Sequence, residues 1–161
     1  SVTVRFMMIP AWLVIAVVGV AIASASSLLS SRDRKWFRQL RRPDWLTFEA
    51  AIPVVWTVVF ICGGWSAYIV WTQTQNWWLM AGYVMLEALI VSYTPVMCKL
   101  RNLRVGTVIG GAGFVFGLVL AWFVAQVDLI ALLLLLPYLL WSPVGTLITW
   151  QMEQLNPSQT T

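Results

Sequence analysis

Five apolar runs, each long enough to cross a lipid bilayer, constrain this chain more than any other feature. They cover residues 7–29, 49–72, 77–98, 105–125 and 129–150 of a 161-residue sequence. A transmembrane helix needs about 20 predominantly apolar residues. The runs therefore predict an all-α integral membrane protein, a single domain over residues 1–161 built as a bundle of five transmembrane helices.

The first of these runs has a second interpretation, because it ends in AIASAS, which resembles the cleavage site of a signal peptide. Its apolar core of about 18 residues is longer than the roughly 7–15 residues of a signal peptide. We therefore expect this run to be a transmembrane helix.

The composition agrees with a membrane protein and narrows its chemistry. The chain is 60% hydrophobic and only 10% charged, whereas a soluble domain carries roughly 25% charged residues. The absence of His removes the commonest metal ligand and the commonest acid–base catalyst near neutral pH. Cys62 and Cys98 are isolated inside apolar runs, so we expect neither a metal site nor a redox pair.

Positive charge is concentrated on one side of the predicted bundle. The loops after the first and third runs together hold nine of the ten Lys and Arg residues, and Arg5 is the one on the opposite side. Cytoplasmic loops of membrane proteins carry the excess of Lys and Arg. We therefore expect the N-terminus outside and the C-terminus in the cytoplasm, in a membrane such as the bacterial inner membrane, and no nucleic-acid partner.

The second run places large rings and small side chains on one helical face. At 100° per residue, its positions Trp56, Phe60, Gly63, Ala67 and Trp71 fall within about 80° of one another, while Trp65 points the other way. Such a face either packs closely against a neighbouring helix or forms one wall of a flat cavity.

The fifth run offers a matching face with Tyr138, Trp141 and Gly145. Rings on facing helices suit a flat aromatic ligand, because aromatic groups stack or meet edge to face. Bundle packing without any ligand is the alternative that these residues leave open.

Glu87 lies inside the third apolar run. A carboxylate within a membrane is costly, so it is a functional candidate by default. It supports an alternative function, a small proton-coupled secondary transporter that uses Glu87.

The fourth run contains two pairs of glycines spaced four residues apart, Gly106 with Gly110 and Gly113 with Gly117. Small residues at this spacing let two helix backbones touch. The contact could lie within one bundle or between two copies of the chain, and the sequence leaves both interpretations open.

An ungapped pattern links the first loop to the second run. It is formed by Trp36, Phe37, Leu40, Arg42, Pro43, Trp45, Val55, Trp56, Val59, Phe60, Gly64, Tyr68, Val70 and Trp71. The fifth run adds Leu134, Leu135, Pro137, Tyr138, Leu139 and Trp141. In these motifs the chain resembles the TspO/translocator protein family, also called tryptophan-rich sensory proteins or peripheral-type benzodiazepine receptors.

The resemblance implies a membrane-embedded binding protein or sensor, often a homodimer, for porphyrins and related tetrapyrroles. Its pocket would lie between the helices under the first loop, with no required cofactor and no metal. A role in tetrapyrrole transport, degradation or stress response is also implied. The ligand-binding residues carried over, or placed beside them by the helical faces, are Arg42, Trp45, Trp56, Phe60, Gly63, Tyr93, Tyr138, Trp141 and Gly145.

No catalytic residue is assigned, and we do not expect an ordinary enzyme. Some bacterial members of the family are reported to promote light-dependent porphyrin breakdown, and for such a reaction Trp56 and Trp141 would be the candidate electron donors. Arg41 and Arg42 at the mouth are expected to pair with propionate groups, since guanidinium matches carboxylate geometry.

The chain also departs from the family pattern. The loop prolines are replaced by Leu46, Thr47 and Phe48, which predicts a more mobile lid over the pocket. No Lys or Arg follows Tyr138 in the fifth run, so we do not expect a sterol role.

Overall fold

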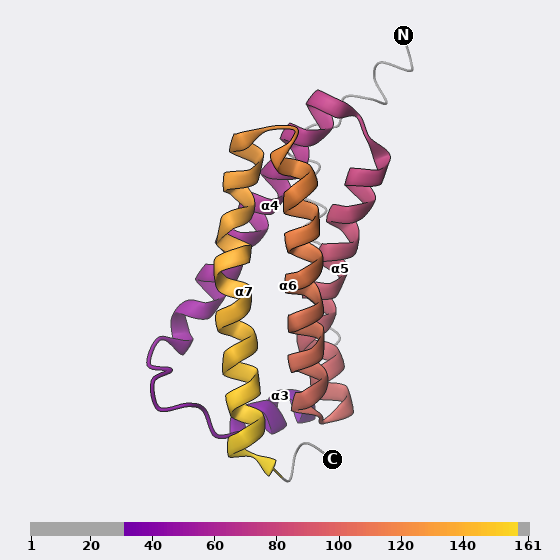
Figure 1. The fold of residues 1–161 in the computed structure, drawn as a ribbon. Helices are drawn as coiled ribbons and strands as arrows, with labels where there is room; N and C mark the ends of the chain where they lie inside the picture. The colour runs from indigo at the N-terminus through magenta and orange to yellow at the C-terminus, as the bar shows by residue number, and fades with distance from the viewer. Residues whose placement is uncertain (1–30, 158–161) are drawn as a thin grey trace.

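A computed structural model describes residues 31–157 as four long helices with a short helix lying across one end (Figure 1). The short helix is α3 (Ser31–Gln39). The 3-10 turn η1 (Glu49–Ala51) leads into α4 (Ile52–Thr74), and the bundle continues with α5 (Trp77–Leu100), α6 (Leu103–Ala125) and α7 (Leu129–Leu155). The predicted span at 7–29 lies outside the described residues.

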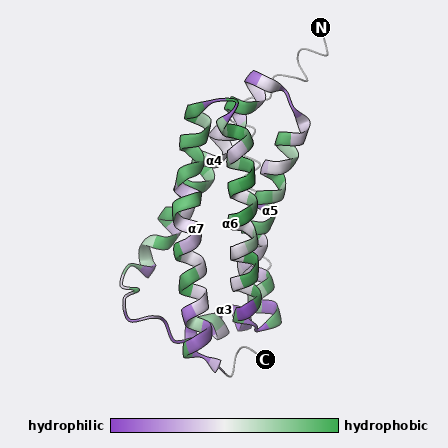
Figure 2. Ribbon diagram, in the orientation of Figure 1, coloured by the Kyte–Doolittle hydropathy of each residue, from purple (hydrophilic) through white to green (hydrophobic). Residues whose placement is uncertain are grey.

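Each of the four long helices is long and apolar enough to cross a membrane. In Figure 2 their hydrophobic residues, coloured green, follow the helices along most of their length. The chain is therefore an integral, multi-pass membrane protein, and the four predicted runs after residue 48 coincide with these helices. The main difference is α7, which continues five residues beyond the predicted end and carries its last turn past the apolar segment.

Short polar residues set where the helices begin. Asn76 and Asn102 cap α5 and α6 by accepting hydrogen bonds from the backbone N–H groups of Trp78 and Arg104, both at 2.9 Å. Asp128 caps α7 in the same way, at 3.0 Å from the N–H of Ala131. Caps of this kind satisfy N–H groups that have no partner inside the helix. The connections between the long helices can therefore be very short.

The helix α3 was not predicted, because the segment after the first apolar run was expected to be a loop. Its inner face carries Asp33 and Trp36, and Leu40 is buried just after it. The Asp33 carboxylate lies 3.3 Å from the Arg101 guanidinium, which also stands 5.5 Å from the centre of the Trp36 ring. Nine residues form a marginal helix on their own, so these contacts with the α5–α6 connection stabilise it.

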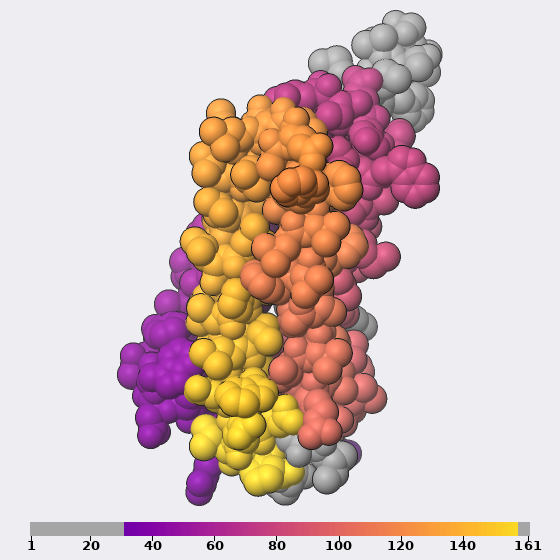
Figure 3. Space-filling model, viewed as in Figure 1, coloured from indigo at the N-terminus to yellow at the C-terminus, as the bar shows by residue number. Residues whose placement is uncertain are grey.

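Four of the five α6 glycines face inward, toward α5 and α7. They are Gly106, Gly110, Gly113 and Gly117. A Cβ atom at Gly113 or Gly117 would lie 2.8 Å from the Tyr138 side chain, and one at Gly110 would lie 2.6 Å from Thr146 Oγ1. Side chains do not tolerate such distances, so this glycine face serves close packing within one chain. Figure 3 shows α6 and α7 side by side.

All nine Lys and Arg residues within 31–157 gather at the end of the bundle where α3 lies. They belong to α3, to the loop after it, and to the α5–α6 connection with the first turn of α6. The connections at the opposite end, residues 75–76 and 126–128, carry no Lys or Arg. The charge asymmetry seen in the sequence is therefore a property of the folded bundle.

We predict that Gly117→Ala destabilises the protein and that Gly111→Ala does not. A methyl group at Gly117 meets the buried Tyr138 ring, whereas one at Gly111 meets nothing within 4 Å. Overpacking costs about 1–3 kcal/mol, and both variants share the helix-propensity gain of about 1 kcal/mol. Thermal unfolding in detergent should show a lower Tm for Gly117→Ala alone. Equal Tm values for the two variants would contradict the packing role of this glycine.

Candidate functional site

A cavity of about 350 Å³ lies among α4, α5, α6 and α7, beneath the loop that follows α3. Its walls are largely apolar, with Ile52, Leu89, Ile90, Ile109 and Ile148 among them. The charged residues in the lining are Arg42 and Glu49, which form an ion pair. Ligand pockets are typically about 300–1,000 Å³ and mostly apolar. This cavity is therefore the candidate binding site.

Six of the nine predicted ligand-binding residues line the cavity. They are Arg42, Trp56, Tyr93, Tyr138, Trp141 and Gly145. They come from the loop, from α4, from α5 and from α7, so four separate segments contribute to the lining of one cavity. Helical periodicity placed Trp56 and the three α7 residues on faces, and the family resemblance supplied Arg42 and Tyr93. The bundle brings all six together.

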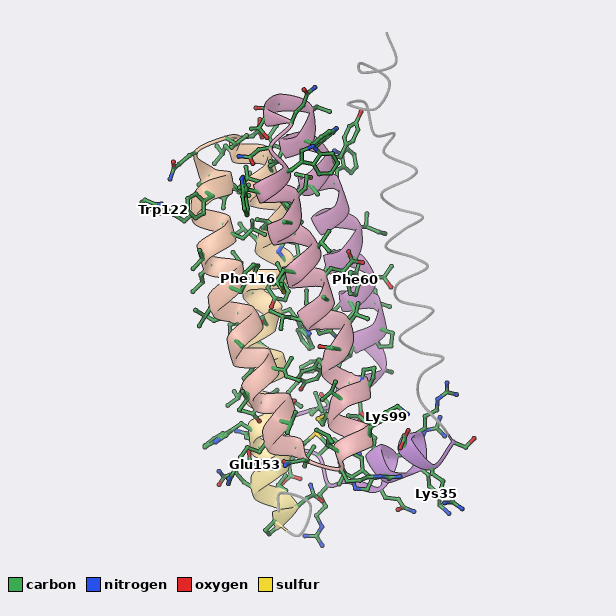
Figure 4. The ribbon with its side chains drawn as sticks, turned by 90° about the vertical axis from the view of Figure 1, so that its right-hand side faces the viewer. Lys35, Phe60, Lys99, Phe116, Trp122 and Glu153 are labelled. Carbon is green, nitrogen blue, oxygen red and sulfur yellow. The ribbon has the colours of Figure 1, made fainter. Side chains whose placement is uncertain are left out.

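The other three predicted residues do not line the cavity. Gly63 faces open space, because a Cβ atom there would meet nothing within 4 Å. Phe60 contacts the Trp56 ring, at 6.1 Å between centroids, from outside the lining; Figure 4 shows Phe60 on α4. Of the predicted face of α4, Trp56 lines the cavity and Trp71 is buried. The helix also buries Val59 and Val70, which lie to one side of that face.

Trp45, the third of these residues, belongs to a line of aromatic rings that covers the cavity. Its ring lies 6.3 Å from Phe48, which lies 6.4 Å from Trp141, which lies 6.5 Å from Trp56. The last two contacts are edge to face, a favourable geometry for aromatic pairs. The Trp45 Nε1 group also donates a hydrogen bond of 2.6 Å to Gln151 Oε1 on α7.

The loop is attached to the end of α7 a second time through Arg41 and Asn156. The backbone N–H of Arg41 donates to Asn156 Oδ1, and Asn156 Nδ2 donates to the carbonyl of Arg41, both at 3.0 Å. This reciprocal pair uses backbone groups of Arg41 and does not depend on its guanidinium. Together with the Trp45 bond it holds the loop, residues 40–48, against α7.

Arg42 lines the cavity but is already bonded on several sides. Its Nη1 donates to the carbonyls of Leu40 at 2.6 Å and Phe37 at 2.7 Å, and its Nε lies 3.1 Å from Glu49 Oε1. The guanidinium also stands 4.9 Å from the centre of the Phe37 ring. Arg42 therefore holds the end of α3 and the start of η1 together.

Two buried polar atoms of the lining, Trp141 Nε1 and Thr146 Oγ1, have no hydrogen-bond partner within residues 31–157. Buried polar groups are nearly always bonded, so each such atom calls for an explanation. The Tyr93 and Thr149 hydroxyls, by contrast, share a hydrogen bond, and Thr149 Oγ1 donates to the carbonyl of Gly145 at 3.1 Å. The cavity thus offers one unused donor and one unused hydroxyl to a ligand.

Several cavity residues were not predicted, notably Phe48, Glu49, Ser142 and Thr146. Phe48 takes its place beside Trp141, and the other three line the cavity. The two α7 residues could have been predicted from helical spacing, since Ser142 is four residues after Tyr138 and Thr146 is four after Ser142. Phe48 and Glu49 gave no such signal, because their positions depend on the path of the loop.

The arrangement suits binding better than acid–base chemistry. Glu87 is absent from the lining, and the carboxylate that is present, Glu49, is paired with Arg42. Among residues 31–157 no three His, Cys, Asp or Glu side chains are grouped to hold a metal ion.

Comparison with known proteins gives consistent matches. The model of the family described as "TspO/MBR family" matches residues 10–155. An uncharacterized membrane protein of Bacillus subtilis, YtaB, is 28% identical over 89% of this chain and 95% of its own length. A tryptophan-rich protein TspO of Bacillus cereus is 26% identical, covering 81% of this chain and 87% of the relative. A tryptophan-rich sensory protein of Cereibacter sphaeroides is 24% identical, covering 83% and 84%.

We predict that Arg42→Gln destabilises the loop, whereas Arg41→Gln does not. Hydrogen bonds that involve a charged group contribute about 1.5–3 kcal/mol, and Arg42 makes several that the shorter side chain cannot span. The neighbouring Arg41 uses its backbone for its bonds with Asn156. Hydrogen exchange in detergent should show faster exchange over residues 40–48 in Arg42→Gln. Equal exchange in the two variants would show that Arg42 does not hold the loop.

Proposed function

The chain belongs to the TspO/MBR family, and on that premise we propose that its cavity binds a flat aromatic ligand, a porphyrin or related tetrapyrrole. The observation that carries the proposal is the pair of indoles at the cavity wall. Trp56 and Trp141 come from different helices and meet at 86° between planes. A planar ligand lying along one indole would present its edge to the other.

The lining supports this choice of ligand in two ways. Its apolar walls suit a large aromatic body, and burial of apolar area is the main favourable term in such binding. The unpartnered Trp141 Nε1 and Thr146 Oγ1 suit a ligand that carries nitrogen or oxygen atoms within its ring system. Tetrapyrroles combine both properties.

The carboxylates of such a ligand meet a different environment from the one that the sequence led us to expect. Arg42 is paired with Glu49, so a propionate reaches its guanidinium only by replacing Glu49. The Glu49 side chain is half exposed at the rim of the cavity and is free to turn outward. We therefore place the propionates at the mouth of the cavity, under the loop.

The proposed setting is a sensor or binding protein in a bacterial inner membrane. The α3 end, which carries nine cations, faces the cytoplasm under the positive-inside rule, and the C-terminus follows α7 to that side. A homodimer would use a surface other than the α6 glycine face, because that face packs inside the chain.

Titration with protoporphyrin, followed by tryptophan fluorescence in detergent, tests the proposal. We expect quenching at micromolar ligand and about five-fold weaker binding in Trp56→Leu, since the lost aromatic contact is worth roughly 1 kcal/mol beyond its area. Trp65→Leu is the matched control, because Trp65 lies on the same helix with its side chain exposed. Absence of quenching, or equal weakening in the two variants, would contradict this site.

Glu87 supports a second candidate function, proton-coupled transport. It lies in the middle of α5, and its Oε1 atom is buried with no hydrogen-bond partner in the part of the chain that the structure describes. A membrane carboxylate of this kind is a site where a proton can be carried. We expect transport, if this function holds, to depend on a carboxylate at position 87.

The transport candidate is tested by protoporphyrin uptake into vesicles under a pH gradient. Glu87→Gln should abolish the pH-driven uptake, because the amide cannot titrate. Glu153→Gln is the control, since Glu153 pairs with Arg104 at the charged end of the bundle. Uptake that does not change in Glu87→Gln would rule out this role.

A further inference from the structure

The outer surface of α3 is rich in cations. Three of them, Arg34, Lys35 and Arg38, line a hollow together with Ser31 and Gln39. The hollow has a volume of about 410 Å³ and lies apart from the aromatic cavity, whose lining shares none of these residues. Figure 4 shows Lys35 at the end of the bundle, directed away from it.

Four other cations at this end of the bundle have acidic partners. Lys99 and Arg101 pair with Asp33 at 3.9 and 3.3 Å, and Arg104 pairs with Glu153 at 3.0 Å. Arg42 pairs with Glu49, as described above. For Lys35 and Arg38 the described part of the chain provides no acidic side chain within ion-pair distance, and both are exposed.

The inner contacts of α3 set the direction of these cations. Asp33 and Trp36 anchor one side of the helix to Arg101, and Leu40 is buried beyond them. Positions 34, 35 and 38 lie on the opposite side, because successive residues turn by 100°. The cations are therefore directed outward by the fold at the end of the membrane-spanning helices, where phospholipid headgroups lie.

We propose that this hollow binds the phosphate headgroup of an anionic phospholipid of the surrounding membrane. Arg and Lys form short, charge-assisted hydrogen bonds with phosphate oxygens. Basic clusters beside a transmembrane helix bind anionic lipids in this way. The Ser31 hydroxyl and the Gln39 amide add neutral polar groups to the rim, suited to the hydroxyl groups of a glycerol headgroup.

Native mass spectrometry of the detergent-purified protein, titrated with phosphatidylglycerol or phosphatidylcholine, tests the proposal. Wild type should retain phosphatidylglycerol in preference to phosphatidylcholine. The double variant Lys35→Gln with Arg38→Gln should bind phosphatidylglycerol about 25-fold more weakly, which is about five-fold for each cation removed. Both residues are exposed, so we expect its helical circular dichroism and its Tm to match those of wild type.

Two controls separate a headgroup site from general attraction. Arg32→Gln removes a cation from the same helix that does not line the hollow, and it should change binding less than two-fold. Inorganic phosphate at concentrations equal to the lipid should not displace phosphatidylglycerol. Equal losses in the Arg32 and Lys35/Arg38 variants, no preference between the two lipids, or displacement by inorganic phosphate would each overturn the proposal.

Discussion

The contact of Tyr138 with Gly113 and Gly117 sets the distance between α6 and α7, and the rest of the bundle depends on it. In lipid there is no hydrophobic drive between helices, so close backbone approach and dispersion contacts hold them together. The Tyr138 ring fills the space that the two glycines leave. Tyr138 is also part of the cavity wall. Its contact with α6 therefore positions Trp141 and Ser142, one turn further along α7, at the same cavity.

A second constraint comes from the loop over the cavity. The sequence predicted greater mobility here, since the loop lacks the family's prolines. The structure shows how the loop is held instead: by Arg42 at its start, by Asn156 on Arg41, and by rings from Trp45 through Phe48 to Trp141. In a loop with prolines, the fixed backbone dihedral angles of the prolines would restrict the chain. Here hydrogen bonds and ring contacts do so, and these can break without the unfolding of a helix.

The four spans within residues 31–157 were predictable from sequence, and their rotations only in part. Hydrophobic length and capping residues such as Asn102 and Asp128 locate helix ends, because both signals are local. The angular face of α7 was also predicted well, since Tyr138, Trp141 and Gly145 all line the cavity. On α4 the same reasoning placed Phe60 and Gly63 in the pocket, where they do not lie. The rotation of α4 about its own axis depends on which of its faces contacts α7, and this is decided by tertiary packing.

The short helix α3 illustrates a related limit. A nine-residue helix has no propensity signal strong enough to be read alone, and its existence rests on Asp33 and Trp36 meeting Arg101 from a distant connection. The sequence therefore predicted the positive charge of this segment correctly. It did not predict that residues 31–39 form a helix.

Residues of helix α3 line two different hollows of the protein. Phe37 lines the aromatic cavity, while Lys35 and Arg38 line the outer hollow only one and two residues away along the chain. A single turn of helix therefore joins the two proposed sites, and any link between their occupancies would pass through it. Thermodynamic reciprocity requires that whatever factor a headgroup exerts on cavity affinity, the cavity ligand exerts on headgroup affinity. The lipid composition of the membrane would in that way become an effector of the ligand site.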